Sequence, residues 1–524
     1  MPIGLIGKFN ILQQSPHDLL APAVSEGPAA SSTLYWVPSR YNIRATAEDG
    51  RLVLWNTLSG KMTVFNSVDR DAVLDLLQKK GFEAPKEKIV EYLVERGYLV
   101  RKGVDEFRQF QQLFGQQHYR TDALELILLA SEDCNFRCTY CYEDFARGTM
   151  IPEVREGIKN LVRKRIKKLN LLHISWFGGE PLYGWEAVED LAPFFVEIAD
   201  EHEVPFGTNM TTNGYLLTPD VVDKLFTWRI RQFQITLDGL PEHHNHSRVG
   251  RDGSETFEKI FDNLKALARR DEDFHVLLRV NFDRLNSGGL SKFVDTLSNE
   301  FKDDSRYSLL LKAVGKWGSP NDPQLDVCGG DEAARIQRDI LAQARKQGLH
   351  FGTLRDAARL GSKVCYAARP YNFLIGATGK VMKCTIVLDK DDHNVVGRIT
   401  PEGALELDRD RMALWTEPAF EQDSQCRKCV VLPNCQGISC PLIRIEDDTQ
   451  PCISTRSNPK GELLAVLDAP GSKGRRVPVG RRNAKGGEPV VTLNEAQHNA
   501  ESPEDPLSHR GESVLRTEPG TAQL

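Results

Sequence analysis

Three cysteines near residue 140 have a spacing that suits metal binding. Cys134, Cys138 and Cys141 form the pattern C-x3-C-x2-C directly after a predicted strand at 123–130. Three thiolates on one tight loop can ligate three irons of a 4Fe–4S cluster and leave the fourth iron open to an external ligand, whereas a closed structural site needs four protein ligands. A zinc loop with a remote fourth ligand fits the spacing equally well, so the spacing alone leaves both hypotheses open.

Seven more cysteines gather toward the C-terminal part of the chain: Cys365, Cys384, Cys426, Cys429, Cys435, Cys440 and Cys452. Seven thiols cannot saturate two four-ligand sites, which argues against structural zinc. The chain has 11 cysteines, an odd number, and no export signal, so dense thiols indicate metal or iron–sulfur ligation rather than disulfides. Cys328 is left over; it could fill a vacant ligand position, but a buried apolar thiol is the safer expectation.

Small and polar residues follow the next predicted strands. Gly178 and Gly179 end the strand at 172–177, where two glycines let a ligand approach the backbone, and Glu180 could accept a hydrogen bond from an amino group. Thr212 and Asn213 end the third strand, where a hydroxyl and an amide could bind a ribose. An ordinary turn explains the last pair equally well.

A polar segment follows the fourth strand. Asp238 begins an Asp-Gly-Leu-Pro sequence that is also typical of a simple turn. His243, His244 and His246 could be taken for a metal cluster, but a solvated loop is the better interpretation.

The elements that must position these residues alternate between strand and helix from Asp122 onward. The predicted strands are 123–130, 172–177, 206–211, 232–237, 275–281 and 307–314, and the predicted helices are 152–168, 184–201, 219–228, 255–268, 289–301 and 331–347. Six such units predict a parallel sheet with right-handed crossovers, curled into a full or partial (β/α) barrel with its chemistry at the carboxyl ends of the strands. The alternative is an open doubly wound sheet, which the absence of G-x-G-x-x-G after the first strand disfavours.

The flanking segments have different compositions. Short strands at 41–47, 51–57, 61–66 and 98–101 and helices at 69–79 and 85–96 predict a small winged module. Residues 351–458 show little periodicity, so we expect metal to supply much of their folding free energy. The predicted division is an irregular segment 1–33, a winged module with its linker 34–118, a core 119–350, a cysteine-rich domain 351–458 and a disordered tail 459–524.

The segments CNFRCTYCYE and WFGGEP, each after a strand, together resemble the radical S-adenosylmethionine (radical SAM) superfamily. Tyr140 fills the aromatic position of the signature C-x3-C-x-aromatic-C. The resemblance covers roughly 122–350, and it implies a partial (β/α)6 barrel of the TIM type.

The resemblance also implies a cofactor and a reaction. A 4Fe–4S cluster on the three cysteines would bind the amino and carboxylate groups of S-adenosylmethionine and cleave it to methionine and a 5′-deoxyadenosyl radical, which takes a hydrogen atom from the substrate. The implied cofactor-binding residues are Tyr140, Gly178, Gly179, Glu180, Thr212, Asn213 and Arg248. Asp238 lies where some relatives place an acid near the substrate and is the implied catalytic residue.

The C-terminal cysteines resemble the SPASM extension of peptide-modifying radical SAM enzymes, which carries two auxiliary 4Fe–4S clusters. By that resemblance one set is Cys426, Cys429, Cys435 and Cys452, and the other is Cys365, Cys384 and Cys440. The gap before Cys440 is one residue longer than usual, and some relatives have an extra cysteine between the Cys365 and Cys384 positions. The second cluster is therefore expected to keep one iron open.

The winged module resembles the peptide-recognition element of enzymes that mature ribosomally made peptides; a structural N-terminal cap is the alternative. We expect a maturase that takes hydrogen from a precursor peptide or protein and receives electrons from a flavodoxin- or ferredoxin-type donor. The alternatives are a sulfatase-type (formylglycine) maturase, a non-catalytic iron–sulfur or zinc protein and, less favoured, a small-molecule dehydrogenase.

Charge and composition narrow the remaining classes. Lysine and arginine number 67 and aspartate and glutamate 73, a net charge of −6, which argues against a nucleic-acid partner. No segment approaches the roughly 20 apolar residues that span a bilayer. With no signal sequence and a need for reduced thiols, we expect a cytoplasmic protein with no membrane partner.

Overall fold

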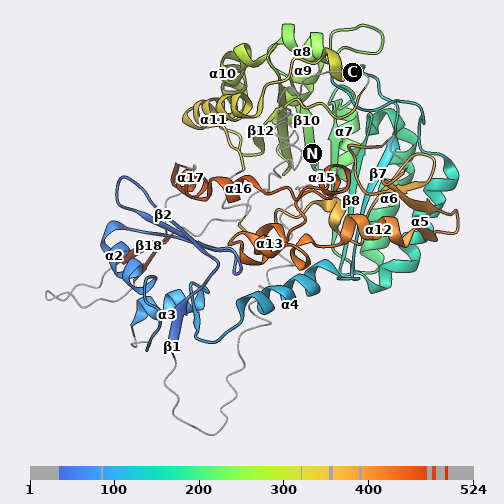
Figure 1. Cartoon of the computed structure of the whole chain (residues 1–524). Coiled ribbons are helices and arrows are strands. Elements are labelled where there is room, and N and C mark those ends of the chain that lie inside the picture. Colours follow the sequence, from blue (N-terminus) through green and yellow to red (C-terminus); the bar gives the residue numbers. More distant parts are fainter. Residues whose placement is uncertain are drawn as a thin grey trace, which may run out of the picture.

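A computed structural model describes residues 35–83, 87–319, 321–352, 358–388, 392–468, 475–478 and 490–493 (Figure 1). The segment predicted to be irregular, 1–33, and most of the chain after 468 lie outside these described residues. Within them, no helix is both long enough and apolar enough to cross a membrane.

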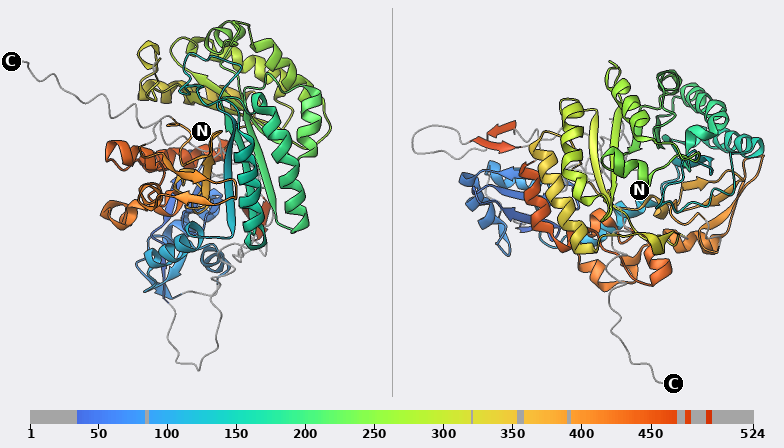
Figure 2. Two further views of the ribbon diagram at one scale, coloured as in Figure 1. Left: turned by 90° about the vertical axis from the view of Figure 1, so that its right-hand side faces the viewer. Right: turned by 90° about the horizontal axis from the view of Figure 1, so that it is seen from above.

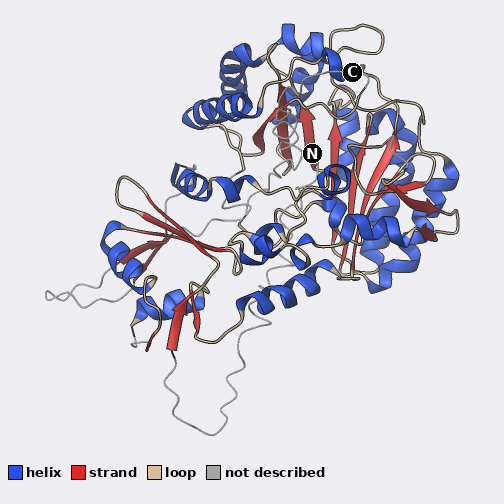
Figure 3. Ribbon diagram, in the orientation of Figure 1, coloured by secondary structure: helices blue, strands red, loops and turns tan. Residues whose placement is uncertain are grey.

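A ten-stranded sheet stands at the centre of the described chain (Figure 3). Its order is β12-β11-β10-β9-β8-β7-β13-β14-β15-β16, and the strands from β12 to β13 run parallel to one another. The six strands predicted in the core are confirmed to within one residue at each end: β7 (Ala123–Ser131), β8 (Leu171–Gly178), β9 (Phe206–Thr212), β10 (Gln232–Thr236), β11 (His275–Phe282) and β12 (Tyr307–Ala313). Nearly every residue of β7 and β8 is buried, as expected for parallel strands covered on both faces.

Helices of the core cover one face of this sheet, and the helical segments after β16 lie on the other (Figure 2, left). They are α5 (Pro152–Arg165), α6 (Trp185–Glu201), α7 (Pro219–Thr227), α8 (Pro241–Ser247), α9 (Phe257–Ala268), α10 (Leu290–Phe301) and α11 (Gly330–Lys346). Six of them confirm the predicted helices. Helices α5, α6, α7, α9 and α10 each bury an apolar stripe; α6, for example, buries Val188, Leu191 and Phe195.

The helix α8 was not expected, and it changes the interpretation of the three histidines. His244 is fully buried: its Nδ1 accepts a hydrogen bond from the Asp238 amide at 3.1 Å, and its Nε2 lies 3.2 Å from the Thr256 hydroxyl. Burial lowers the pKa of His244 well below its usual value, so the imidazole is neutral. The solvated-loop prediction is therefore wrong for His244, which is a structural residue beneath Asp238.

The N-terminal module contains two small antiparallel sheets, β2-β3-β4 and β5-β1-β6. The predicted strands and helices are confirmed, and β1, β5 and α4 are additional: β1 (Tyr35–Pro38), β2 (Asn42–Thr46), β3 (Leu52–Asn56), β4 (Lys61–Phe65), α2 (Ser67–Leu76), β5 (Phe82–Glu83), α3 (Lys88–Glu95), β6 (Leu99–Arg101) and α4 (Glu106–His118). At the centre of the module, the Thr63 hydroxyl bonds the hydroxyls of Tyr92 and Tyr98 at 3.0 and 2.8 Å.

The cysteine-rich segment is more regular than predicted and shares the central core. Its strands and helices are β13 (Asn372–Ile375), β14 (Lys380–Met382), β15 (Val395–Ile399), β16 (Leu405–Leu407), α12 (Arg409–Thr416), α13 (Ser424–Lys428), α14 (Leu432–Cys435), α15 (Pro441–Asp447) and α16 (Ser454–Ser457). Strand β13 pairs in parallel with β7, and Phe373, Leu374 and Trp415 join the same apolar core as β7 and β8. The first half of this segment therefore contributes to a core that it shares with β7 and β8, and the expected contribution of metal to its folding stays a prediction.

The predicted disordered tail begins with ordered structure. Helix α17 (Pro459–Ala465) and the turn that follows it place Leu463 and Val466 against Ile43 and Trp55 of the N-terminal module. Disorder starting at 459 is therefore wrong for residues 459–468. Beyond them the structure describes only two paired strands, β17 (Arg475–Pro478) and β18 (Val490–Leu493).

Candidate active site

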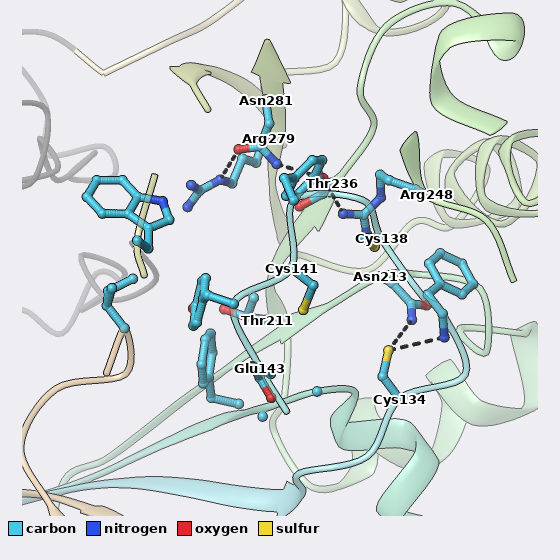
Figure 4. Close-up of a pocket in the computed structure, with 18 of the residues that line it drawn as sticks. Cys134, Cys138, Cys141, Glu143, Thr211, Asn213, Thr236, Arg248, Arg279 and Asn281 are labelled. Atoms are coloured by element: carbon cyan, nitrogen blue, oxygen red, sulfur yellow. Dashed lines mark hydrogen bonds between the residues drawn. The ribbon is translucent and has the colours of Figure 1, made fainter. Parts of the chain in front are cut away.

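A pocket opens at the carboxyl ends of the core strands, and the three cysteines after β7 line it (Figure 4). Their loop is held by the segment that follows α8. The Arg137 amide donates to the Val249 carbonyl and the Thr139 amide to the Ser247 carbonyl, both at 2.9 Å. Two further donors face Cys134 itself: the Phe136 amide lies 3.3 Å and the Asn213 side-chain amide 3.8 Å from its sulfur.

The three thiols are soft ligands that are withdrawn from water. Burial raises the pKa of Cys134, Cys138 and Cys141, so as free groups they are neutral thiols at pH 7. In the described part of the chain, no group of three His, Cys, Asp or Glu side chains converges closely enough for one metal ion. Three thiols spread around one pocket suit a multinuclear group, whose irons each take one sulfur, better than a single ion.

The glycine pair after β8 packs directly on the cysteine loop. A Cβ atom at Gly178 would lie 2.1 Å from the Ser131 carbonyl oxygen, and one at Gly179 would lie 2.6 Å from the Asp133 carbonyl oxygen and 3.1 Å from Cys134 Cβ. Gly178 also has a φ of +121°. Any side chain here would displace the cysteine loop, so both glycines are required by close backbone packing and leave their own backbone facing the pocket.

Glu180 lies just behind the pocket lining. Its side chain is fully buried and accepts three hydrogen bonds: from the Leu182 amide at 3.0 Å, the Thr212 hydroxyl at 2.7 Å and the Asn213 amide at 2.7 Å. It thereby fastens the end of β9 to the end of β8. Thr212 and Asn213 do line the pocket, with Asn213 also bonded to Asn135 of the cysteine loop at 2.8 Å. A direct contact of Glu180 with a cofactor stays a prediction.

Tyr140 connects the cysteine loop to the strands on the opposite side. Its hydroxyl donates to Asp238 and accepts from Arg248 at 2.8 Å and from the Asn281 side chain at 3.1 Å, which uses its full hydrogen-bonding capacity. Asp238 also accepts from the Asn281 amide at 2.8 Å and is almost completely buried. Burial raises the pKa of Asp238 and the Arg248 charge lowers it. Tyr140 and Arg248 line the pocket, while Asp238 lies behind them, so its catalytic role also stays a prediction.

Sequence reasoning assigned no role to several polar residues of the lining, among them Arg279, Asn281 and Glu143. Arg279 and Asn281 both project from β11 into the pocket, and the Arg279 Nε donates to the Asn281 side-chain oxygen at 2.8 Å. Polar residues two apart on a buried strand share one face, and that alternation could have pointed to them. Glu143, two residues after Cys141, also lines the pocket; burial, together with the charges of Glu132 and Asp144, raises its pKa to about 8.

Four of the C-terminal cysteines influence one another electrostatically, and their role as cluster ligands stays a prediction. Burial raises the pKa of Cys426, Cys429 and Cys435, and the charge of Cys452 raises all three. These four thiols are therefore within electrostatic reach of one another. Arg456 donates to Cys452 at 2.6 Å.

Cys365 and Cys384 form a separate pair. Burial, followed by the charge of Cys365, raises the pKa of Cys384 to about 12. The charge of Cys384 also raises the pKa of Tyr142, which lines the pocket. Ile386, two residues after Cys384, lines the pocket as well, so Cys365 and Cys384 adjoin the pocket wall. Cys440 is buried at the start of α15. Cys328 is half-buried and packs against the main core. The charge of Glu332 raises its pKa and that of Arg284 lowers it.

Comparison with known proteins identifies the core. Residues 128–286 match the model of the radical SAM superfamily. This part of the chain belongs to the radical SAM superfamily. The matched range begins within β7 and ends after β11, and so contains the cysteine loop, the glycine pair and the Tyr140 network.

Curated relatives of this domain include a cyclopropyl synthase and two maturation enzymes. The chain is 24% identical over 222 residues to the radical SAM cyclopropyl synthase TigE of Paramaledivibacter caminithermalis, covering 38% of this chain and 46% of that protein. It is 27% identical to the cysteine-type anaerobic sulfatase-maturating enzyme of Clostridium novyi, over 38% of this chain and 53% of that enzyme. It thus spans about half the length of these relatives. The mycofactocin maturase MftC of Mycobacterium tuberculosis is 22% identical over 364 residues, or 66% of this chain and 87% of the maturase.

A solved structure shows the same fold. The structure of histidine-tagged anSMEcpe with bound AdoMet superposes with a TM-score of 0.50 and 19% identity, covering 66% of this chain and 93% of that one. Membership of the radical SAM superfamily implies a 4Fe–4S cluster and S-adenosylmethionine. The donor set fits them, because three thiols and the backbone of Gly178 and Gly179 line one pocket.

Proposed function

We propose that this radical SAM protein modifies a peptide or protein substrate by hydrogen-atom abstraction, as a maturase. The observation that carries the proposal is the joint lining of one pocket by the three cysteines, Gly178 and Gly179. The names of two relatives, the Clostridium novyi enzyme and MftC, support a maturation reaction. The MftC alignment is longer than the whole predicted core of 119–350, so it includes flanking sequence as well.

The cofactor-binding roles follow from the pocket. Cys134, Cys138 and Cys141 would hold the cluster, and the lining residues Tyr140, Gly178, Gly179, Thr212, Asn213 and Arg248 would bind S-adenosylmethionine. When bound, a reduced 4Fe–4S cluster supplies the electron that splits S-adenosylmethionine into methionine and a 5′-deoxyadenosyl radical. Glu180 and Asp238 hold the lining in place, and the buried walls exclude water from the radical.

Tyr142, Trp317 and Ile386 add apolar surface to the lining, against which a peptide side chain would pack. A hydrogen atom would leave a side-chain β-carbon or an α-carbon of the peptide and complete 5′-deoxyadenosine. For an oxidised product, the electron left on the peptide would pass to an acceptor. We propose that this acceptor is an auxiliary 4Fe–4S cluster, held at Cys365 and Cys384 or at Cys426–Cys452. An external flavodoxin- or ferredoxin-type protein would supply the first electron.

The sulfatase-type reaction is the second candidate, favoured by the similarity to the Clostridium novyi enzyme. One experiment separates these two reactions. The full chain is incubated anaerobically with dithionite and S-adenosylmethionine, once with a Cys- or Ser-containing sulfatase-motif peptide and once with peptides encoded beside its gene. Maturase activity predicts a mass change only in an encoded precursor, with deuterium moving from a labelled precursor into 5′-deoxyadenosine. Conversion of the short sulfatase-motif peptide without any leader would contradict the first proposal and support the second.

A further inference from the structure

Arg279 places a positive charge in the pocket that no acidic side chain neutralises. It lines the pocket from β11, is half-buried, and donates from its Nε to the Asn281 side-chain oxygen at 2.8 Å. Among the residues that the structure describes, its two terminal nitrogens meet no hydrogen-bond acceptor and no carboxylate at ion-pair distance. A guanidinium withdrawn from water is stabilised by an anion, and its planar fork of N–H groups matches a carboxylate. The missing partner is therefore an anionic ligand.

The carboxyl groups of the same pocket do not supply this partner. Asp238, behind the lining, already accepts from the Tyr140 hydroxyl and from the Asn281 amide at 2.8 Å. Glu143 also lines the pocket, but it lies on the opposite side of the cysteine loop from Arg279 (Figure 4). The charge of Arg279 is thus left for a molecule that enters the pocket.

Arg279 lies in the half of the pocket away from the glycine pair. In the sheet, β10 and β9 separate β11 from β8, and Arg279 is in register with Leu310 of β12. Its guanidinium points away from Arg248 (Figure 4), the arginine that the family resemblance places toward the cofactor. An anion that reaches Arg279 therefore belongs to a second molecule, bound on the β11 and β12 side.

The segment after β12 gives this half of the pocket an apolar wall. The Val314 amide donates to the carbonyl of the last residue of β11 at 2.7 Å, and the Ser319 hydroxyl donates to the Cys141 carbonyl at 3.0 Å. Between these fixed points, Trp317 lines the pocket, and its ring lies on Gly315, where a Cβ atom would be 2.4 Å from the ring. An indole and an unpaired guanidinium in one half of a pocket suit a peptide that offers apolar surface together with a carboxylate.

We propose that Arg279 binds a carboxylate of the substrate peptide and so selects which peptides are modified. The inference rests on the proposed function, since it requires a peptide substrate. The bond to Asn281 holds the guanidinium by Nε and leaves the two terminal nitrogens to donate to both carboxylate oxygens. An Asp or Glu side chain and the C-terminal carboxylate of a peptide present the same group, and the experiment distinguishes these two sources.

The test uses the peptides encoded beside the gene that the unchanged chain modifies. Each Asp and Glu of such a peptide is replaced singly by Asn or Gln, and in a further peptide the C-terminal carboxylate is amidated. One of these changes should lower kcat/KM about 10- to 100-fold, the range of a hydrogen bond to a charged group, mainly by raising KM. The same change should alter kcat/KM of Arg279→Gln less than about twofold, because its partner is already lost. The sensitive position identifies the source of the carboxylate.

Arg269→Gln, the same charge change at an exposed position after α9, is the matched control and should keep the full sensitivity to the peptide change. Equilibrium dialysis without reductant should give all variants an affinity for S-adenosylmethionine within about twofold of the unchanged chain. A large loss of that affinity in Arg279→Gln would assign Arg279 to the cofactor. A peptide series in which no carboxylate matters, or in which Arg279→Gln keeps the full sensitivity, would show that Arg279 does not bind the peptide; each of these results overturns the proposal.

Iron content and Tm are measured for every variant, so that a folding defect is recognised. If Arg279→Gln fails to assemble iron, Arg279→Lys, which keeps the charge but loses the fork of N–H groups, should show the same peptide selectivity with a smaller loss. If the unchanged chain modifies no peptide, the proposed function fails, and the inference fails with it.

Discussion

Glu180 offers a direct test of whether a motif residue binds ligand or holds the pocket together. The substitution Glu180→Gln keeps the size of the side chain and one carbonyl oxygen. That oxygen can still accept from the Leu182 amide and the Thr212 hydroxyl, but the new amide group faces the Asn213 N–H, which was 2.7 Å from the carboxylate. Two donors then oppose each other at a fully buried position.

The expected cost follows from these three bonds. Each retained bond changes from a charged to a neutral acceptor, a loss of roughly 1 kcal/mol, and the orphaned Asn213 amide adds about 1–3 kcal/mol. The sum is about 3–5 kcal/mol. For a domain of about 150–250 residues each kcal/mol lowers Tm by about 2–4 °C, so Tm should fall by roughly 6–20 °C.

Thermal unfolding of the full chain measures the global effect, and hydrogen exchange locates it. The Asn213 amide should exchange faster in Glu180→Gln, whereas the Leu182 amide keeps most of its protection. Glu197→Gln, an exposed carboxylate on α6, is the matched control and should leave both unchanged. The positioning role would be refuted if Glu180→Gln melts like the unchanged chain but binds S-adenosylmethionine more weakly and 5′-methylthioadenosine, which lacks the amino acid part, as before. That result would show that Glu180 contacts the ligand directly.

Three further predictions concern other parts of the molecule. Cys429→Ala should lose about four irons per chain while S-adenosylmethionine is still cleaved. Cys328→Ser is the control, and equal iron in the two variants would contradict a cluster at Cys429. Gly179→Ala, whose Cβ would lie 2.6 Å from a carbonyl oxygen of the cysteine loop, should lose most of its iron, whereas Gly115→Ala, with no neighbour within 4 Å, should not. Burial lowers the pKa of His118 from 6.5 to about 4, so its stabilising contribution is complete above pH 6.5 and is lost as the pH falls toward 4. His118→Gln should remove about 3 kcal/mol of pH-dependent unfolding free energy over that range, and an unchanged pH profile of Tm would contradict it.

The core strands could be predicted because each is a short apolar run bounded by turn residues. The pairing of β13 with β7 could not, since Asn372 meets Glu125 across a long stretch of sequence and no local pattern reveals such a partner. The same long-range pairing explains why the sequence of the cysteine-rich segment shows no core of its own, since its apolar residues complete the core of other strands. Helix α8 was missed because its histidines suggest a polar loop, and the burial of His244 depends on Asp238 and Thr256 around it.

The site was predictable where it is local in sequence. The cysteine spacing and the glycine pair each occupy one loop, and the structure brings these two loops into contact. Arg279 belongs to no motif, and Glu143 ends the cysteine segment without an assigned role; only the fold shows that both line the pocket. Whether Glu180 faces a ligand or the protein interior depends on where β9 ends, which the spacing of the motif does not encode.

The central claim is that the three cysteines after β7 hold the cluster of a radical SAM enzyme. The most direct measurement reconstitutes the full chain anaerobically with iron and sulfide, counts both, and then assays 5′-deoxyadenosine after addition of dithionite and S-adenosylmethionine. We predict about twelve irons per chain with 5′-deoxyadenosine formed, and about eight irons without it in Cys138→Ala. Formation of 5′-deoxyadenosine by Cys138→Ala, or zinc in place of iron with no product from the unchanged chain, would contradict the account.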